Sequence, residues 1–423
     1  MARKKPGTVI SVFSGAMGLD LGLRQIGIHS SLAVELDQQC CKTIRTNMPD
    51  ANVWETDVRQ LDGNSLRQRA GNPDDVFLMV GGPPCQSFCP GGKRAALSDP
   101  RGNLIYTYLK LINEVRPQFF VLENVANIVT AALRHRPISK RPGKRWNLSV
   151  YDQQKHAAGN ESADAMEPDE LSGSAIRQVI ADINDIDYHL NFAVVNAADY
   201  GAPQHRLRFI ILGARQGVPP AIPPATHGNS SGLLPFRTVR DAIYDLREDP
   251  GQSSQYTEGV AKYFRMVAPG GHWRDIPREL QREALGNASF EAGGGKTGFF
   301  RRLAWDSPAP TITGKANRKG SALCHPDAVR PLSIKECARL QGFPDDWKLT
   351  GSMNKQYAQI GNAVPVQLGA AIGLAILNSV SKKSPALPPR QFDLELAIMS
   401  AVKRLRASAR NKRVTDDSQL VLF

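Results

Sequence analysis

The feature that most constrains the fold is an alternation of strand-like and helix-like segments in the first third of the chain. Short apolar runs over residues 8–13, 76–80 and 119–125 are typical of buried strands. The intervening segments, such as 17–27 and 104–115, space their apolar residues as helices do. Strands that alternate with helices indicate a parallel sheet covered on both faces. We therefore expect an α/β fold with a doubly wound, mostly parallel sheet.

The alternation of strand-like and helix-like segments stops after about residue 130 and then resumes. Residues from about 130 to 173 are first basic and proline-containing and then polar, which indicates an insertion. Residues 217–232 are rich in Pro, Gly and Ser and predict a linker. After the insertion we expect strands over 190–195 and 208–214, and helices over 175–186, 332–343, 364–380 and 394–407.

Composition narrows the class of protein. The 423 residues hold 53 Lys and Arg against 40 Asp and Glu, a net charge of +13. Such an excess suits a polyanionic partner such as nucleic acid, although a basic surface also serves solubility alone. The six cysteines include no CxxC pair and no zinc-like spacing with His, so we expect a reducing cytoplasm and no metal. We expect no membrane span, and we interpret the N-terminus as a first strand, not a signal peptide.

Two strand ends predict a nucleotide-like ligand. The turn FSGAMGLDLG, residues 13–22, follows the first strand, and its small residues let backbone N–H groups approach a ligand. It lacks GxGxxG, so the dinucleotide fingerprint is absent. Glu35, with Asp37 as the lesser candidate, ends the second strand where such folds hold a ribose diol. Asp57 is expected to add a third polar group near the same crevice. Together they indicate an adenosine-bearing ligand, against the plainer alternative of a tight turn and solvated acids.

A cysteine follows the strand over 76–80 in the segment GGPPCQSF. Cys85 stands where the carboxyl end of a central strand meets the ligand crevice, and the prolines before it restrict the direction of its thiol. A reactive thiol must ionise, which requires nearby positive charge or N–H groups. A buried, inert cysteine is the usual alternative, but the Pro-Pro-Cys context favours a nucleophile. Cys89 occupies a position where the chemistry needs no thiol.

Two further segments place polar groups near this crevice. FVLENV ends another strand with Glu123 and Asn124, and a buried glutamate there can donate or share a proton. QHRLR supplies Gln204, Arg206 and Arg208, and alternation puts both arginines on one face of a strand. A carboxylate, a thiol and two arginines favour binding of an electron-rich heterocycle over mere surface charge.

Five motifs in this order along the chain resemble those of the DNA (cytosine-5)-methyltransferase family. They are FSGAMGLDLG, GGPPCQSF, FVLENV, QHRLR and QIGNAVP. The resemblance covers residues 7–214 and about 301–376, and the joint order is far more specific than any single motif. It implies binding of S-adenosylmethionine in the first crevice and a Rossmann-like methyltransferase fold. It also implies methylation of C5 of a cytosine flipped out of double-stranded DNA, through a covalent cysteine adduct.

The resemblance assigns roles residue by residue. Cys85 matches the nucleophile that adds to C6, and Glu123 the acid that holds N3 and the exocyclic amine. Arg208 matches the contact to the cytosine O2, with Arg206 supporting the catalytic site. The remaining matches are to cofactor-binding positions (Phe13, Gly15, Gly18, Glu35, Asp57, Asn362) and to substrate-binding positions (Gln86, Ser87, Asn124, Gln204).

The resemblance also predicts the domain organisation. A catalytic and cofactor-binding block over 7–214, interrupted by the insertion, is completed by a second block over 301–380. Target recognition is expected over 216–300, and 381–423 forms a basic C-terminal tail. The basic and aromatic residues that offer DNA contacts are His272, Trp273, Arg274, Lys296, Arg301 and Arg302.

We therefore predict a monomeric enzyme of bacterial restriction–modification type that acts on duplex DNA, with a cognate restriction endonuclease as functional partner. One alternative is the same chemistry on RNA, and another is a silent DNA-binding regulator that keeps the fold. A nicotinamide oxidoreductase is disfavoured because GxGxxG is absent. Two positions depart from the family pattern: Met17 stands where many members have glycine, and Leu36 where some have an aromatic residue.

Overall fold

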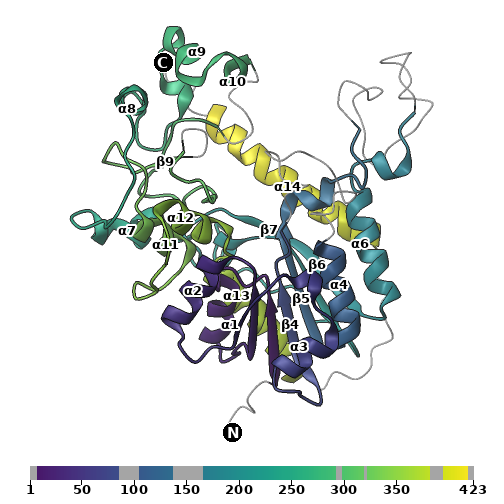
Figure 1. Cartoon of the computed structure of the whole chain (residues 1–423). Helices are drawn as coiled ribbons and strands as arrows, with labels where there is room; N and C mark the ends of the chain where they lie inside the picture. The colour runs from purple at the N-terminus through teal and green to yellow at the C-terminus, as the bar shows by residue number, and fades with distance from the viewer. Residues whose placement is uncertain are drawn as a thin grey trace.

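A computed structural model describes residues 7–84, 104–136, 165–291, 298–318, 322–381 and 394–417. At its centre is a seven-stranded sheet in the order β3-β2-β1-β4-β5-β7-β6 (Figure 1). Strand β7 is antiparallel to both of its neighbours, and the other paired strands are parallel, which confirms the predicted α/β class. The strands are β1 (Thr8–Val12), β2 (Leu32–Glu35), β3 (Val53–Glu55), β4 (Val76–Gly81), β5 (Phe119–Val125), β6 (His189–Asn196) and β7 (Leu207–Ala214).

Helices cover both faces of the sheet because the central strands are apolar on both sides. Met79 and Leu122 face one core cluster, and their neighbours Leu78 and Val121 face the other. The first cluster is covered by α4 (Leu104–Val115) and α6 (Ser174–Asp185), and the second by α1 (Gly18–Gln25) and α13 (Val366–Ser381). Two further helices, α2 (Gln38–Asn47) and α3 (Gly63–Arg69), complete the layers.

Helix α13 packs closely on α1 because α1 carries glycines at the contact. A Cβ on Gly22 would lie 2.2 Å from the carbonyl oxygen of Val366, and one on Gly18 would lie 2.3 Å from that of Val364. The segment Met353–Val380, which contains α13, is long and apolar enough to cross a membrane by length and mean hydropathy. However, 67% of its most apolar window is buried, as expected for a core helix of this fold.

Between β7 and α13 the chain forms a smaller part above the carboxyl edge of the sheet (Figure 1). Its own apolar cluster includes Phe264, Trp273, Phe300 and Cys324. The predicted linker over 217–232 is bonded to the sheet, since Nδ2 of Asn191 in β6 donates to the Pro220 carbonyl at 3.1 Å. The elements are α7 (Val239–Ile243), α8 (Glu258–Phe264), α9 (Arg278–Leu285), α10 (Asn287–Glu291), β8 (Arg301–Arg302), β9 (Leu323–Cys324), α11 (Ile334–Gln341) and α12 (Met353–Asn362).

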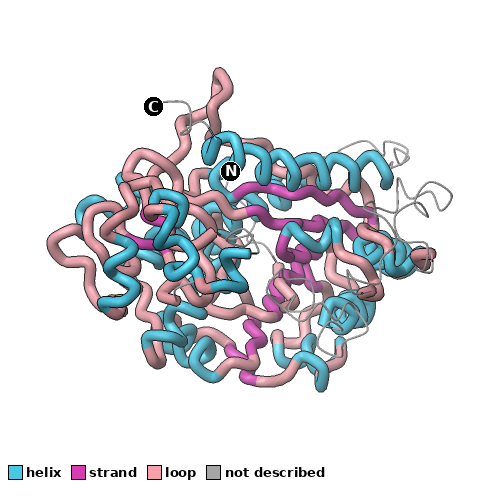
Figure 2. Tube along the Cα trace, turned by 90° about the horizontal axis from the view of Figure 1, so that it is seen from above, coloured by secondary structure: helices cyan, strands magenta, loops and turns pink. Residues whose placement is uncertain are grey.

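The C-terminal helix α14 (Leu394–Asp417) returns to the sheet. It contains the helix predicted over 394–407 and continues for ten residues beyond it. It packs against β6 and runs along that edge of the sheet, as the view from above shows (Figure 2). Ile398, Ala401 and Val402 are buried in the main core, so this part of the predicted basic tail is docked on the catalytic domain.

Candidate active site

The carboxyl ends of the parallel strands open into one large cavity of about 3290 Å³. Phe13, Glu35, Gly82 and Glu123 line it at or just beyond the ends of four neighbouring strands. This is where ligands bind in open α/β sheets. The smaller part of the chain contributes the opposite wall, which includes the predicted DNA contacts His272, Trp273, Arg274, Arg301 and Arg302. Lys296 lies outside the described residues.

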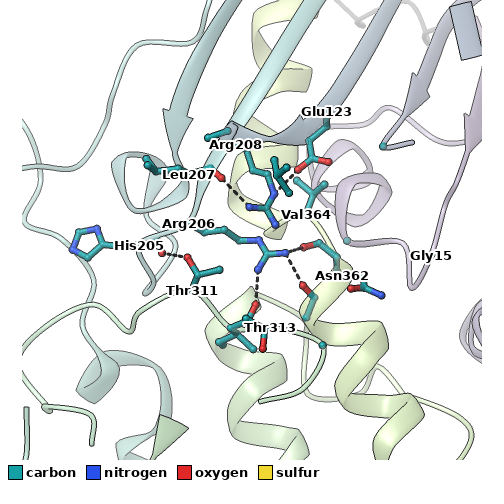
Figure 3. A pocket seen from close by; sticks show the side chains of 18 of the residues that line it. Gly15, Glu123, His205, Arg206, Leu207, Arg208, Thr311, Thr313, Asn362 and Val364 are labelled. Carbon is teal, nitrogen blue, oxygen red and sulfur yellow. Dashed lines mark hydrogen bonds and ion pairs between the residues drawn. The ribbon is translucent and has the colours of Figure 1, made fainter. Parts of the chain in front are cut away.

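Glu123 and Arg208 form an ion pair on the wall of this cavity. Nε of Arg208 lies 2.6 Å from Oε1 of Glu123, and their side chains are only 11% and 10% exposed. The pair joins β5 to the antiparallel strand β7, and the two side chains point toward each other (Figure 3). Because Arg208 also donates to the carbonyl of Leu207 at 2.8 Å, its guanidinium is held in one orientation. The structure thus brings together two of the predicted catalytic residues.

The backbone that leads to Cys85 passes beside this pair. A Cβ on Gly82 would lie 3.0 Å from Oε2 of Glu123, so glycine allows the segment to approach the carboxylate. Asn124, only 2% exposed, donates from Nδ2 to the carbonyl of Pro83 at 3.2 Å. Pro84 directly precedes Cys85 in the sequence. The predicted residues Cys85, Gln86 and Ser87 themselves lie outside the described part of the chain.

Arg206 is buried behind the cavity wall and holds two distant segments together. Its guanidinium donates to the carbonyls of Ile312 and Gly361, both at 2.6 Å, and of Ala363 at 3.1 Å (Figure 3). The side chain is 1% exposed, and burial lowers the pKa of the guanidinium well below its usual value. Arg206 therefore fixes the position of the loop that follows Asn362.

Gln204, predicted to bind substrate, does not reach the cavity. It is fully buried, and its Nε2 donates to the carbonyl of Leu340 at 2.8 Å and to the side chain of Gln341. Its Oε1 accepts from the Ile312 N–H at 3.3 Å. With both ends of the amide engaged inside the protein, Gln204 connects α11 to the strand region instead of facing a ligand.

The first crevice is organised around the Glu35 carboxylate. One of its oxygens accepts from the Gly15 N–H at 2.8 Å, and the other accepts from the N–H groups of Leu36 and Asp37 at 2.9 and 2.8 Å. Phe13, Gly15 and Met17 all adopt left-handed conformations, with φ of 56°, 53° and 68°. Glycine takes this conformation without strain, so the left-handed φ of Met17 is consistent with the glycine that the family resemblance leads us to expect at this position. A Cβ on Gly15 would meet no atom within 4 Å, so open space lies beside this turn.

The other predicted cofactor residues border the same cavity. Asp57 caps the 3₁₀ turn Val58–Gln60 and pairs with Arg59, whose hydrogen bond lowers the pKa of the Asp57 carboxyl. Asn362 ends α12 with an exposed side chain. All six residues predicted to bind the cofactor therefore border one cavity: Phe13, Gly15, Gly18, Glu35, Asp57 and Asn362. Among the described residues, no group of three or more His, Cys, Asp or Glu side chains could hold a metal.

Sequence reasoning missed one wall of the cavity. Arg404, Leu405 and Ala407 of α14 border it, and Arg404 pairs there with Asp199. The apolar spacing within α14 is a signal that the helix docks somewhere, but nothing in the sequence identifies the surface that receives it.

Comparison with known proteins agrees with this geometry. The profile of the family described as C-5 cytosine-specific DNA methylase matches residues 7–137 and 169–378. The chain is 34% identical over 380 residues to type II methyltransferase M.Eco47II of Escherichia coli, covering 89% of this chain and 80% of that protein. It is 30% identical over 387 residues to type II methyltransferase M.Sau96I of Staphylococcus aureus, covering 90% and 78%.

Solved structures share the fold at lower identity. A DNA modification methyltransferase encoded within an E. coli prophage aligns with a TM-score of 0.61 at 20% identity, covering 89% of this chain and 99% of that one. The methyltransferase EhMeth of Entamoeba histolytica aligns with a TM-score of 0.53 at 14% identity, covering 90% and 100%. The family profile, which spans both blocks that build the cavity, identifies this chain as a member of the C-5 cytosine-specific DNA methylases.

Proposed function

We propose that this DNA cytosine-5 methyltransferase is the sequence-specific, type II member of a restriction–modification system. The names of its relatives M.Eco47II and M.Sau96I support this, because both are type II methyltransferases. A cognate restriction endonuclease is then its functional partner, and duplex DNA in the bacterial cytoplasm its substrate. The observation that carries the assignment of the site is the Glu123–Arg208 pair beside the backbone that leads to Cys85.

The first crevice fits S-adenosylmethionine, the methyl donor of this family. The Glu35 carboxylate stands at the tip of β2, where ribose hydroxyls are held in such folds, and open space lies beside Gly15. Asp57 and Asn362 contribute further polar groups that border the same cavity. Arg206 acts as a positioning residue, since it holds the loop after Asn362 through backbone carbonyls. When bound, S-adenosylmethionine supplies an electrophilic methyl group to C5 of cytosine.

The remaining chemistry belongs to residues of this chain. The Cys85 thiolate forms a bond to C6 of the flipped cytosine, and the displaced electron pair makes C5 nucleophilic. Glu123 holds N3 and the exocyclic amine and supplies the proton that N3 needs as this charge develops. Arg208 orients the Glu123 carboxylate and contacts the cytosine O2. After methylation, a solvent base takes the C5 proton, the sulfur–C6 bond breaks with its electron pair left on sulfur, and N3 returns its proton to Glu123, which restores the aromatic ring, the thiolate and the carboxylic acid.

Bisulfite sequencing of DNA from a methylation-free host that expresses the protein tests this function. Protected cytosines in one recurring short motif are expected, because a type II enzyme marks a defined site. Unprotected DNA in the presence of folded protein would contradict the proposal. Methylation of RNA from the same cells would then favour the RNA alternative, and its absence would favour a silent regulator.

We assign target recognition to the region of the smaller part around the apolar cluster of Phe264, Trp273 and Phe300, and we extend it past residue 300. Its apolar cluster joins Tyr263 and Phe264 to Phe300 and Cys324, and this packing supports a boundary later than the predicted residue 300. Within it, Arg301 and Arg302 both border the cavity but differ in their contacts. Arg302 donates to the carbonyls of Pro326, Val267 and Asp327 at 2.8 to 3.0 Å.

Arg301 has the properties of a base-reading residue. Its Nε is buried without a hydrogen-bond partner among the described residues, and burial lowers the pKa of the guanidinium. A buried N–H donor without an acceptor is costly unless a ligand supplies the missing acceptor. Guanine presents two acceptors, O6 and N7, that match a guanidinium in the major groove. Arg301 is therefore expected to read a guanine of the target site.

Arg301→Gln should lower kcat/KM on the cognate duplex by roughly 5- to 150-fold, because one bidentate contact contributes about 1–3 kcal/mol. The same variant should discriminate less between guanine and other bases at one position, measured on duplexes with single substitutions. Arg302→Gln is the matched control and should mainly lower the melting temperature, since its donors hold protein carbonyls. Parent-like discrimination by Arg301→Gln would exclude base reading by this residue.

A further inference from the structure

Helix α14 lies outside the part of the chain that the family profile matches, which ends at residue 378. The helix docks through one stripe, in which Ile398, Ala401 and Val402 are 4%, 4% and 8% exposed, and Leu405 continues it. Their spacing of three and four residues places them on one face of a helix. This apolar face packs against β6 and the 3₁₀ turn Ala126–Thr130, which follows β5 and Glu123.

Two ion pairs fix the direction of α14 along the sheet. Near its start, Glu395 accepts from Nε and Nη2 of Arg177 on α6 at 2.9 and 2.7 Å. Further along, Arg404 pairs with Asp199, a buried carboxyl whose pKa is raised by burial. Asp199 borders the cavity, so Arg404 neutralises a carboxylate that would otherwise repel a polyanion there.

The docked part of α14 ends at the cavity. Arg404, Leu405 and Ala407 border the same cavity as Glu123 and Arg208. The backbone then remains helical to residue 417, ten residues or about 15 Å further. In Figure 1 this end of α14 projects beyond the sheet toward the part that carries α8, α10 and β9. The helix therefore crosses beside the space in which the duplex must lie to present a base to Glu123.

Charge indicates what this helix contacts. By sequence α14 carries six Lys and Arg against three acidic residues. Lys403 and Arg406, which are one helical turn apart, are both exposed. Exposed lysine and arginine side chains beside a DNA-binding cavity are suited to phosphate contacts, which add affinity without reading sequence.

We propose that α14 is an accessory DNA-binding element that contacts backbone phosphates of the duplex outside the target site. This inference rests on the DNA methyltransferase function but not on the assignment of Cys85 or Glu123. The docked half of the helix supplies rigidity, and the exposed cations supply electrostatic attraction. The element would lengthen the stretch of duplex that the enzyme holds while leaving the choice of target to the smaller part of the chain.

The experiment compares the parent with Lys403→Gln/Arg406→Gln, in which the docking stripe and both ion pairs remain. Equilibrium binding is measured against salt on a duplex of about 12 base pairs that holds only the target, and on one of about 30 base pairs. On the long duplex the slope of log K against log salt should fall by about 2 in magnitude, since each lost phosphate contact removes about 1. On the short duplex the two proteins should bind alike.

The matched control is Lys42→Gln/Lys110→Gln, which removes the same charge from exposed positions on helices α2 and α4. It should bind both duplexes as the parent does. An α14 variant that keeps the parent's salt slope on the long duplex would overturn the proposal, as would equal losses on both duplexes. Failure of the parent itself to methylate DNA would instead contradict the proposed function, so the two outcomes are distinguishable.

Discussion

The Cys85→Ala variant should transfer no detectable methyl group to duplex DNA, while binding S-adenosylmethionine as the parent does. Without the thiolate, no bond forms at C6 and C5 does not become nucleophilic. Removal of a covalent nucleophile of this kind costs on the order of 10⁴-fold or more in kcat. Transfer of labelled methyl groups measures the first property, and calorimetric titration with S-adenosylmethionine measures the second.

The other cysteines should not replace Cys85. Cys41 and Cys324 are buried, and burial raises their pKa to about 12 and about 11; it also raises the pKa of Cys337. A raised pKa keeps each of these thiols protonated at pH 8, and only the thiolate is nucleophilic. A duplex with 5-fluorocytosine at the target provides the test, because fluorine cannot leave as a cation and the sulfur–C6 bond persists.

The parent and Cys89→Ala should both form this adduct, stable in denaturant, whereas Cys85→Ala should not. The Cys89→Ala variant is the matched control, since it removes a neighbouring thiol from the same segment. An adduct formed by Cys85→Ala would show that another side chain attacks the base, and would remove Cys85 from its proposed role.

The central sheet could be predicted because parallel strands buried on both faces are recognisable as continuous apolar runs. β4 and β5 stand where such runs occur, and α4 matches its predicted bounds. The three-residue strand β3 and the polar helix α3 were missed, because neither carries an apolar period long enough to detect. Several helices of the smaller part have five to eight residues and depend on tertiary packing more than on local sequence.

The crevice could also be anticipated, since carboxyl ends of parallel strands converge whatever the loops do. Glu35 and Glu123 line the cavity for this reason. The direction of the side chains just before β7 could not be anticipated from the sequence. Gln204 and Arg206 point into the protein, where they form hydrogen bonds to residues 312, 340 and 361. These partners lie more than 100 residues further along the chain. Long-range partners of this kind leave no local pattern.

Glu123→Gln should lower kcat by about 10²- to 10⁴-fold, the usual contribution of a positioned acid or base. Glutamine keeps the size of the side chain and can still accept from Arg208, but it has no proton to supply to N3. Single-turnover methylation with saturating DNA measures this effect separately from binding. Some loss of stability is also expected, because the Arg208 guanidinium loses its 2.6 Å ionic partner in a site that is only about 10% exposed.

A matched variant separates chemistry from stability. Glu336 is fully buried and pairs with Arg330 at 2.7 Å, but it does not border the cavity. Glu336→Gln should therefore lower the melting temperature at least as much as Glu123→Gln does, while the folded fraction keeps the parent's kcat. If both variants lose activity only in proportion to unfolded protein, Glu123 is a structural partner of Arg208. If only Glu123→Gln loses kcat below its melting transition, the carboxyl group takes part in the chemistry at N3.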